Sequence, residues 1–213
     1  MINKVIIAFF ILFVNTAFSG VTIVGTRFTI NQENKYTNIK IINDNENEYL
    51  IKSEVNDNDF IMSPPLFMMS KNSSRNITII PTNNLSYHTD KIINLTIVAI
   101  PKSEFDNNIS SVSLAIRSHF KLIFRHAELK ERDFKLINIV KENNQYFLFN
   151  KSKHVFTISI AKKKNSKNKK IFNIPPNDKI ALNNICNSHF CDLFVNFHDE
   201  NNNVVKIINL SYK

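Results

Sequence analysis

The sequence predicts an all-β protein built from two immunoglobulin-like β-sandwich domains joined at an angle. In most segments after residue 20, apolar residues occupy every second position, and this period of two is that of a β-strand. Turn-forming polar clusters such as Asn43–Asn47 separate the short apolar runs. The chain has 213 residues, of which 43% are hydrophobic, enough for two domains of about 100 residues each.

The first 19 residues predict a secretory signal peptide. Lys4 provides a positive start, and Val5–Val14 is an apolar core that is too short to anchor the chain in a membrane. Ala17 and Ser19 are the small residues that precede a cleavage site near Ser19 and Gly20. A buried first strand or helix is the alternative. A cleaved signal peptide predicts export into a compartment where disulfide bonds form.

Seven strands are expected in the first domain, which we assign to residues 20–126. Pro64 and Pro65 interrupt the fourth strand, and because proline cannot donate to a ladder, we expect this segment at a sheet edge or crossing between sheets. Seven short strands over about 105 residues indicate an immunoglobulin-like sandwich. The expected strands are residues 21–30, 38–42, 49–55, 60–68, 76–80, 92–100 and 111–125.

The seventh strand, Ser111–Arg125, is unusually long. At about 3.3 Å per residue it can extend roughly 50 Å. We therefore expect its own domain to leave part of its apolar row uncovered, which at a sheet edge is a binding device or an aggregation hazard. The alternative is an ordinary core strand that bends or breaks near Ser118. The apolar row consists of Val112, Leu114, Ile116, Phe120, Leu122 and Phe124.

The charged stretch Arg125–Arg132 predicts a linker or a single helical turn, which places the second domain at residues 127–213. A basic run, residues 162–170, lies between two of the strands expected there. We interpret it as a solvated hairpin tip, with a contact to anionic lipid or to an acidic partner as the alternative. The expected strands are residues 134–140, 146–150, 155–161, 170–174, 180–185, 193–197 and 204–210.

Cys186 and Cys191 are the two cysteines of the chain, and their spacing favours a local disulfide in an exported protein. The alternative, a metal site with His189, lacks further ligands nearby. None of the six histidines forms a recognised ligand pair, and no nucleophile motif is present. With two glycines, a phosphate-binding loop is excluded. We expect no enzymatic activity, no metal and no cofactor.

The formal net charge of +9 is compatible with nucleic acid, an acidic surface or an anionic group on a protein partner. Apart from the basic run, the cations are spread along the chain. We therefore expect no nucleic-acid partner.

Five pieces of the sequence together resemble the periplasmic pilus (fimbrial) chaperones of the chaperone–usher pathway. The resemblance covers the whole mature chain and is strongest in the first domain. It implies a periplasmic protein with a cleft between its two domains. The five pieces are residues 26–28, 41–49, 63–65, 97–101 and 114–125.

The resemblance also implies a mechanism. The family lends its seventh strand to a pilin subunit that lacks its own last strand, and the matching groove-filling residues here are Val112, Leu114 and Ile116. Arg27 and Lys121 would hold the C-terminal carboxylate of the pilin in the cleft and so fix the register of the pairing. Lys121 has the opposite parity to the three lent residues. Without the resemblance, both cations would be assigned to the solvated surface.

Further expectations follow from the same resemblance. Asp90 stands where the family has a glutamate, and with Arg125 it would link the two domains. His126 replaces a usual proline, and Thr78 replaces an expected buried arginine. The short connection from Pro101 to Val112 resembles the subgroup that serves rod-like pili.

The partners implied are pilin subunits, an outer-membrane usher and, for the free chaperone, a second copy of the chain. The rival interpretations are an exported two-domain adhesin or carbohydrate-binding module, and an immunoglobulin-like structural protein.

Overall fold

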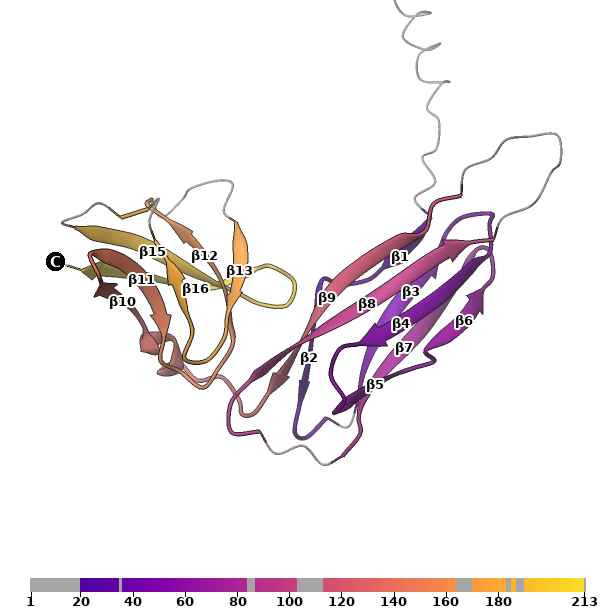
Figure 1. The fold of residues 1–213 in the computed structure, drawn as a ribbon, viewed down its shortest axis with the longest axis horizontal. Coiled ribbons are helices and arrows are strands. Elements are labelled where there is room, and N and C mark those ends of the chain that lie inside the picture. The colour runs from indigo at the N-terminus through magenta and orange to yellow at the C-terminus, as the bar shows by residue number, and fades with distance from the viewer. Residues whose placement is uncertain are drawn as a thin grey trace, which may run out of the picture.

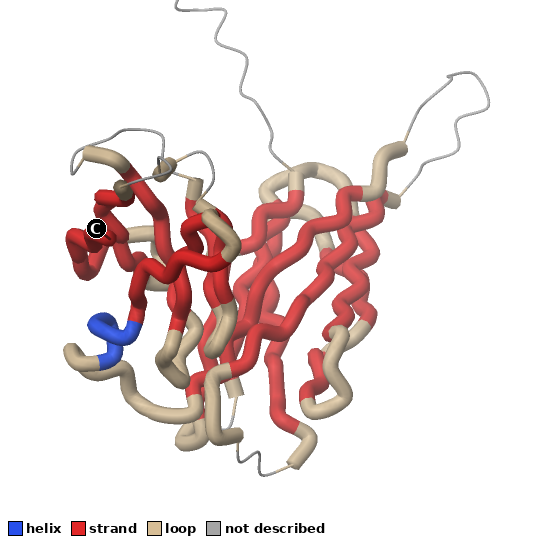
Figure 2. Tube along the Cα trace, turned by 60° about the vertical axis from the view of Figure 1, so that its left-hand side comes forward, coloured by secondary structure: helices blue, strands red, loops and turns tan. Residues whose placement is uncertain are grey.

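A computed structural model of the chain describes residues 20–34, 36–83, 87–102, 113–163, 170–182, 185–186 and 190–212. Two β-sandwiches meet at an angle (Figure 1), and the described helical content is the single turn η1, Asp133–Leu136, drawn in blue in Figure 2. The predicted all-β class with two immunoglobulin-like domains is confirmed. The expected signal peptide, Val112 and residues 164–169 of the basic run lie outside the described residues. No described helix is long and apolar enough to cross a membrane.

Two sheets form the first sandwich. The four-stranded sheet has the order β1-β3-β7-β5, and the five-stranded sheet has the order β2-β9-β8-β4-β6. The strands are β1 (Val21–Ile23), β2 (Arg27–Asn31), β3 (Thr37–Asn43), β4 (Tyr49–Val55), β5 (Phe60–Ser63), β6 (Leu66–Met69), β7 (Ser73–Pro81), β8 (Lys91–Pro101) and β9 (Ile116–Arg125).

The first expected strand is two strands in the structure, because the chain changes sheets at Gly25. This residue has a φ of +108°, a conformation that residues with a Cβ rarely adopt. Before it, β1 pairs antiparallel with β3; after it, β2 pairs parallel with β9. The expectation of one continuous strand over residues 21–30 is wrong: apolar residues alternate on each side of Gly25, but they change from odd to even positions across it.

The proline pair also marks a crossing between sheets. β5 is an edge strand of the four-stranded sheet, and β6 is an edge strand of the five-stranded sheet. Pro64 and Pro65 lie between them, and the Ser63–Pro64 peptide bond is cis. The predicted placement at an edge and between sheets is confirmed.

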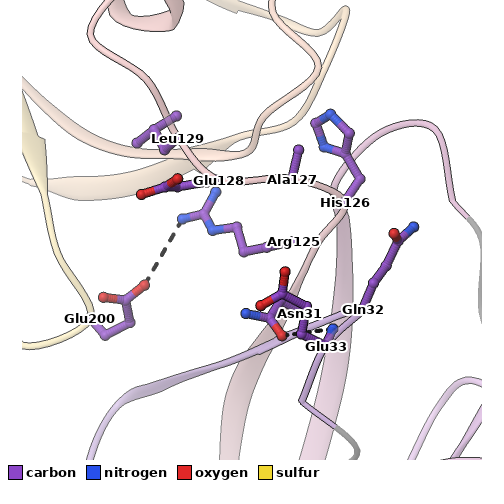
Figure 3. Close-up of a pocket in the computed structure, with 9 residues that line it drawn as sticks. All are labelled: Asn31, Gln32, Glu33, Arg125, His126, Ala127, Glu128, Leu129 and Glu200. Atoms are coloured by element: carbon purple, nitrogen blue, oxygen red, sulfur yellow. Dashed lines mark hydrogen bonds and ion pairs between the residues drawn. The ribbon is translucent and has the colours of Figure 1, made fainter.

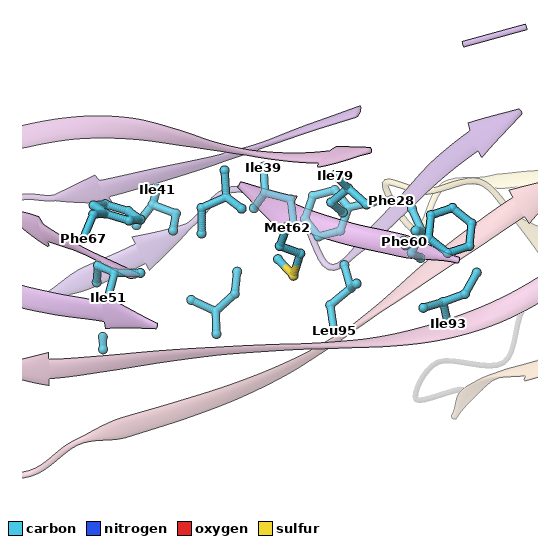
Figure 4. Close-up of a cluster of buried hydrophobic side chains, with 14 of the residues drawn as sticks. Phe28, Ile39, Ile41, Ile51, Phe60, Met62, Phe67, Ile79, Ile93 and Leu95 are labelled. Carbon is cyan, nitrogen blue, oxygen red and sulfur yellow. The ribbon is translucent and has the colours of Figure 1, made fainter. Parts of the chain in front are cut away.

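The core of the first sandwich lies between its two sheets (Figure 4). Side chains from both sheets meet there, and Ile39, Ile41, Ile51 and Leu95 are 0% exposed. This core holds β8 and β9 together as an antiparallel pair that runs from Lys91 opposite Phe124 to Ala99 opposite Ile116.

The second sandwich has a three-stranded sheet, β10-β11-β14, and a four-stranded sheet, β13-β12-β15-β16. The segment expected as a strand from residue 134 begins instead as η1, and the strand expected from residue 180 to residue 185 ends at Ala181. The predicted disulfide between Cys186 and Cys191 is confirmed, with 4.6 Å between the Cα atoms. The strands are β10 (Ile137–Glu142), β11 (Gln145–Asn150), β12 (Phe156–Ala161), β13 (Ile171–Ile174), β14 (Lys179–Ala181), β15 (Cys191–His198) and β16 (Val204–Tyr212).

Candidate functional site: an open strand edge beside the domain interface

β9 carries an apolar row that the core covers at one end only. Leu122 and Phe124 are 0% and 1% exposed, and Phe120 packs against the core as a partly buried side chain. At the other end, Ile116 is 55% exposed, and Leu114, just before the strand, is 74% exposed. The two outer residues therefore continue the core face into solvent.

The same half of β9 has an open backbone edge. β2 pairs with β9 from Arg27 opposite Lys121 to Asn31 opposite Arg125. From Ile116 to Phe120, β9 therefore has no strand partner within the described residues on the side away from β8. The strand passes Ser118, paired with Ile97, without a break. An unpaired edge beside uncovered apolar side chains is a template for another strand.

Arg27 and Lys121 lie where this open edge ends. They are Cα partners in the parallel pair of β2 and β9, so their side chains project from the same outer face of the sheet, opposite to Leu122. The Nζ atom of Lys121 donates to the Oδ1 atom of Asn94, its partner on β8. Two cations and an amide thus form one row across three strands, and the expected opposite parity of Lys121 is observed.

Arg27 also contacts the second sandwich. Its Nη2 atom donates to the side-chain oxygen of Asn202 and to the carbonyl oxygen of Asp199, the latter at 3.2 Å. Its Nε atom is buried and has no hydrogen-bond partner among the described residues. Burial lowers the pKa of Arg27, outweighing the opposite effect of the nearby charges of Glu200 and Asp199. Arg27 is thus a half-buried interdomain residue rather than a freely solvated cation.

Asp90, which directly precedes β8, is the centre of a second contact between the sandwiches, and its side chain is fully buried. Its Oδ2 atom accepts hydrogen bonds from Arg125 Nη1 at 2.6 Å and from the backbone nitrogen of Val155 at 3.0 Å. Its Oδ1 atom lies 2.9 Å from the backbone nitrogen and 2.8 Å from Nδ1 of His126. The backbone nitrogen of Asp90 donates to the carbonyl of Lys153 at 2.8 Å. We call Asp90 with Arg125, His126 and Val155 the interdomain lock.

His154, from the second sandwich, completes the surroundings of Asp90. Its Nδ1 atom lies 3.4 Å from Asp90 Oδ2, its Nε2 atom lies 3.5 Å from Asp133 Oδ2, and its ring centroid is 4.6 Å from that of His126. Burial by itself would raise the pKa of Asp90. The proximity of His154, the charge of Arg125 and the hydrogen bonds from His126 outweigh it, so the pKa of Asp90 lies well below its usual range.

A cleft of about 610 Å³ opens beside this lock (Figure 3). Residues from the end of β2, the connection after β9 and the β15–β16 loop line it. Glu200 points across it toward Arg125, with 4.0 Å between Oε1 and Nη2. The lining residues are Asn31, Gln32, Glu33, Arg125, His126, Ala127, Glu128, Leu129 and Glu200. Arg27 and Lys121 do not line this cleft; they lie four residues earlier on β2 and β9 than Asn31 and Arg125.

Asp90, His126 and His154 each bring one potential metal ligand within 4.8 Å of the others, a grouping found once in the described part of the chain. Both oxygens of Asp90 already accept hydrogen bonds, and the Arg125 guanidinium contacts one of them. A saturated carboxylate beside a guanidinium fits a polar link between domains better than a metal centre.

Sequence reasoning named Asp90 and Arg125, but it missed two of the groups around them. His126 was noted only because it replaces a usual proline of the family, which gave it no role. His154 was missed because it comes from the other sandwich, far from Asp90 in the sequence. It also missed Asn202, because asparagine is frequent along the chain and one more in a loop carries no signal.

Residues 20–130 match the family model described as pili and flagellar-assembly chaperone, PapD N-terminal domain. The match covers just over half of the chain, which therefore belongs to this family of pilus-assembly chaperones. The family membership indicated by the sequence is confirmed. The family is one of chaperones and not of enzymes.

Individual relatives agree with this assignment. The chaperone protein FocC of Escherichia coli is 26% identical over 197 residues, which cover 84% of this chain and 85% of FocC. The fold matches that of the periplasmic chaperone SfaE with a TM-score of 0.68 at 20% identity, covering 90% of this chain and 99% of that one. It also matches a chain of the Salmonella enterica complex of the SafA pilin with the SafB chaperone, with a TM-score of 0.70 at 18% identity, covering 92% of this chain and 97% of that one.

Proposed function

We propose that this chain is a periplasmic chaperone that binds pilin subunits by donating β9, and that residues 20–126 form the subunit-binding domain while residues 127–213 form the second domain. The signal peptide would direct it to the periplasm, and an outer-membrane usher would receive the loaded subunit. Folding of the subunit as it exchanges strands supplies the driving force, so no nucleotide is required.

The observation that carries this proposal is the open, apolar half of β9 that ends at a pair of cations. A strand added to the edge from Ile116 to Phe120 would meet Arg27 and Lys121 at its end. If its terminal carboxylate binds these cations, the added strand must run parallel to β9, in line with β2. One charge-assisted contact would then set the register in which the added strand pairs with β9.

The apolar side chains supply the affinity. Leu114 and Ile116 are exposed in the free protein, and burying each in a subunit groove is worth about 1.5–3 kcal/mol. Val112 would occupy the next position of the same face. Because the core does not hold Leu114 and Ile116, the chaperone can lend them without unfolding its own sandwich.

The test is capture of a co-expressed pilin subunit that lacks its final strand. We expect wild-type chaperone to co-purify with it, and Lys121→Ala and Arg27→Ala to lose most of the capture. Lys40→Ala, which removes an exposed cation from β3 on the other sheet, is the matched control and should capture like wild type. Equal capture by Lys121→Ala and Lys40→Ala would refute the anchor. Failure of the wild type to retain any such subunit would refute the chaperone function itself.

The open edge also supports self-association of the free chaperone. Two copies that pair through residues 116–120 would cover the same apolar side chains that a subunit covers. We expect size-exclusion chromatography to show a dimer that a bound pilin dissolves and that Ile116→Lys weakens. A monomer at all concentrations would contradict this part of the proposal.

A further inference from the structure

The loop between β15 and β16 contacts Arg27, one of the two proposed anchor cations. This loop is tightly organised by Asp199, whose Oδ1 atom accepts hydrogen bonds from the backbone nitrogens of Asn201 and Asn203 at 2.9 and 2.8 Å. The Nδ2 atom of Asn203 donates to the other carboxylate oxygen at 3.0 Å. The loop therefore presents Asn202 to Arg27 from a fixed position, with a φ of +67° at Asn202. Figure 1 shows it reaching from the second sandwich toward the first.

The group that faces Arg27 is neutral, although the loop carries two acids. The carboxylate of Asp199 is occupied by the loop itself, and Glu200 points to Arg125. The acceptors on Arg27 Nη2 are instead an amide oxygen of Asn202 and a backbone carbonyl. Arg27 is therefore held by hydrogen bonds without being neutralised by a partner in contact with it.

One donor of the Arg27 guanidinium is left unpaired among the described residues. In the planar guanidinium, Nε and Nη2 donate toward the same side and form the fork that binds a carboxylate with two hydrogen bonds. Nε is buried and has no partner among the described residues, while Nη2 carries Asn202. Lys121, the neighbouring cation, is also held by an amide oxygen, that of Asn94. Both cations thus carry neutral acceptors at the proposed carboxylate position.

We propose that Asn202 occupies the carboxylate site of the free chaperone: its side-chain oxygen accepts a hydrogen bond from Arg27 Nη2 until the C-terminal carboxylate of the subunit displaces it. This inference rests on the proposed function. Displacement is favourable because a carboxylate brings a full negative charge and two oxygens to the guanidinium, whereas the amide brings one neutral oxygen. Once the Asn202 side chain has moved away, the carboxylate can also accept a hydrogen bond from Nε, which the amide leaves unpaired. A charged residue at position 202 would instead give Arg27 a permanent counter-ion.

The experiment uses three variants of the full chain. Asn202→Asp supplies a competing carboxylate, and asparagine, aspartate and glycine all tolerate a positive φ. Asn202→Gly removes the acceptor without backbone strain. Asn201→Asp is the matched control, since it adds the same charge to the same loop at the adjacent residue. Each variant is assayed for affinity to a pilin lacking its final strand, once with its natural C-terminus and once with two added glycines that displace the carboxylate.

We expect Asn202→Asp to weaken capture of the natural pilin about tenfold relative to Asn201→Asp. Asn202→Gly should bind the natural pilin about two- to tenfold more tightly than wild type, because it removes the acceptor that the carboxylate must displace. The extended pilin should bind more weakly to wild type, and it should not distinguish Asn202→Asp from Asn201→Asp. A purely structural defect would weaken both pilins equally, so this pattern separates the two causes.

Equal capture of the natural pilin by Asn202→Asp and Asn201→Asp would overturn the inference, as would a loss in Asn202→Gly as large as that in Arg27→Ala. Both results leave the anchor itself intact. If wild type instead binds the natural and extended pilins equally, the carboxylate anchor of the proposed function has failed, and the inference fails with it.

Discussion

Replacing Asp90 with asparagine should uncouple the two sandwiches. The substitution keeps the shape of the side chain but removes the charge and turns one acceptor into a donor. An amide nitrogen would then face either Arg125 Nη1 and the Val155 nitrogen, or the two nitrogens of His126. In either orientation, buried donors oppose each other, and Arg125 loses its closest counter-ion.

The expected cost is large because Asp90 is fully buried. Removing one partner of a buried, hydrogen-bonded ion pair destabilises proteins by about 3–5 kcal/mol. Arg125 is partly exposed, with 20% of its side chain accessible, so we place the loss at the lower end, about 3 kcal/mol. Urea unfolding followed by circular dichroism would measure it. Trypsin cleavage after Lys130 or Arg132, in the connection between the sandwiches, should accelerate in parallel.

Asp57→Asn is the matched control. Asp57 lies in the same sandwich and pairs with Lys91 at 2.7 Å, but it has no part in the lock. Its loss should cost about 1 kcal/mol and leave cleavage of the connection unchanged. If Asp90→Asn and Asp57→Asn lower stability equally, and neither changes cleavage, the lock does not hold the sandwiches together and our reasoning is wrong.

Three further predictions follow from single positions. Folding lowers the pKa of Asp90, so the stability that its carboxylate contributes is fully present above the unfolded pKa of about 4. That stability is lost only as the pH falls through the lower folded pKa. Urea unfolding should therefore show a difference in the free energy of unfolding between wild type and Asp90→Asn that does not narrow from pH 7 to pH 5. Gly25→Ala should cost about 1–3 kcal/mol in the same assay, since φ is +108° and the new Cβ would lie 3.0 Å from the Phe28 ring. A loss under about 0.5 kcal/mol would contradict the backbone conformation described at Gly25, where the chain passes between the sheets. Leu122→Ala should cost about 2–5 kcal/mol, because Leu122 is 0% exposed. Leu114→Ala should change stability by less than about 0.5 kcal/mol, because Leu114 is 74% exposed. Equal losses would show that Leu114 packs against the core of the free protein.

Local pattern was sufficient to predict most of the fold. The period of two predicted the strands and assigned Lys121 and Leu122 to opposite faces of β9, because side-chain direction in a strand depends only on parity. The proline pair predicted a crossing because its chemical limit is local. Gly25 carried a signal that the prediction overlooked: the apolar residues change from odd positions (Val21, Ile23) to even positions (Phe28, Ile30) across it. The two halves pair with different sheets.

The interdomain contacts could not be predicted from pattern. Arg27 and Asn202 are 175 positions apart, and Asp90 and Val155 are 65 apart. Such contacts depend on how two folded units meet, which no periodicity encodes. Asp90 and Arg125 were identified by resemblance alone, and His126, one of the two histidines beside Asp90, stands where the resemblance would have supplied a proline.

β9 connects the proposed client site and the interdomain lock in one strand. Lys121 and Arg125 lie on the same outer face, four residues and therefore about 13 Å apart along the strand. Arg27 and Asn31 accompany them on β2 in fixed register. Loss of the lock would therefore move the β15–β16 loop away from Arg27 while leaving Arg27 and Lys121 side by side, since their pairing lies wholly within the first sandwich. Mutations can therefore separate the two proposed anchor cations from the residues that position the second domain, although β9 carries members of both groups.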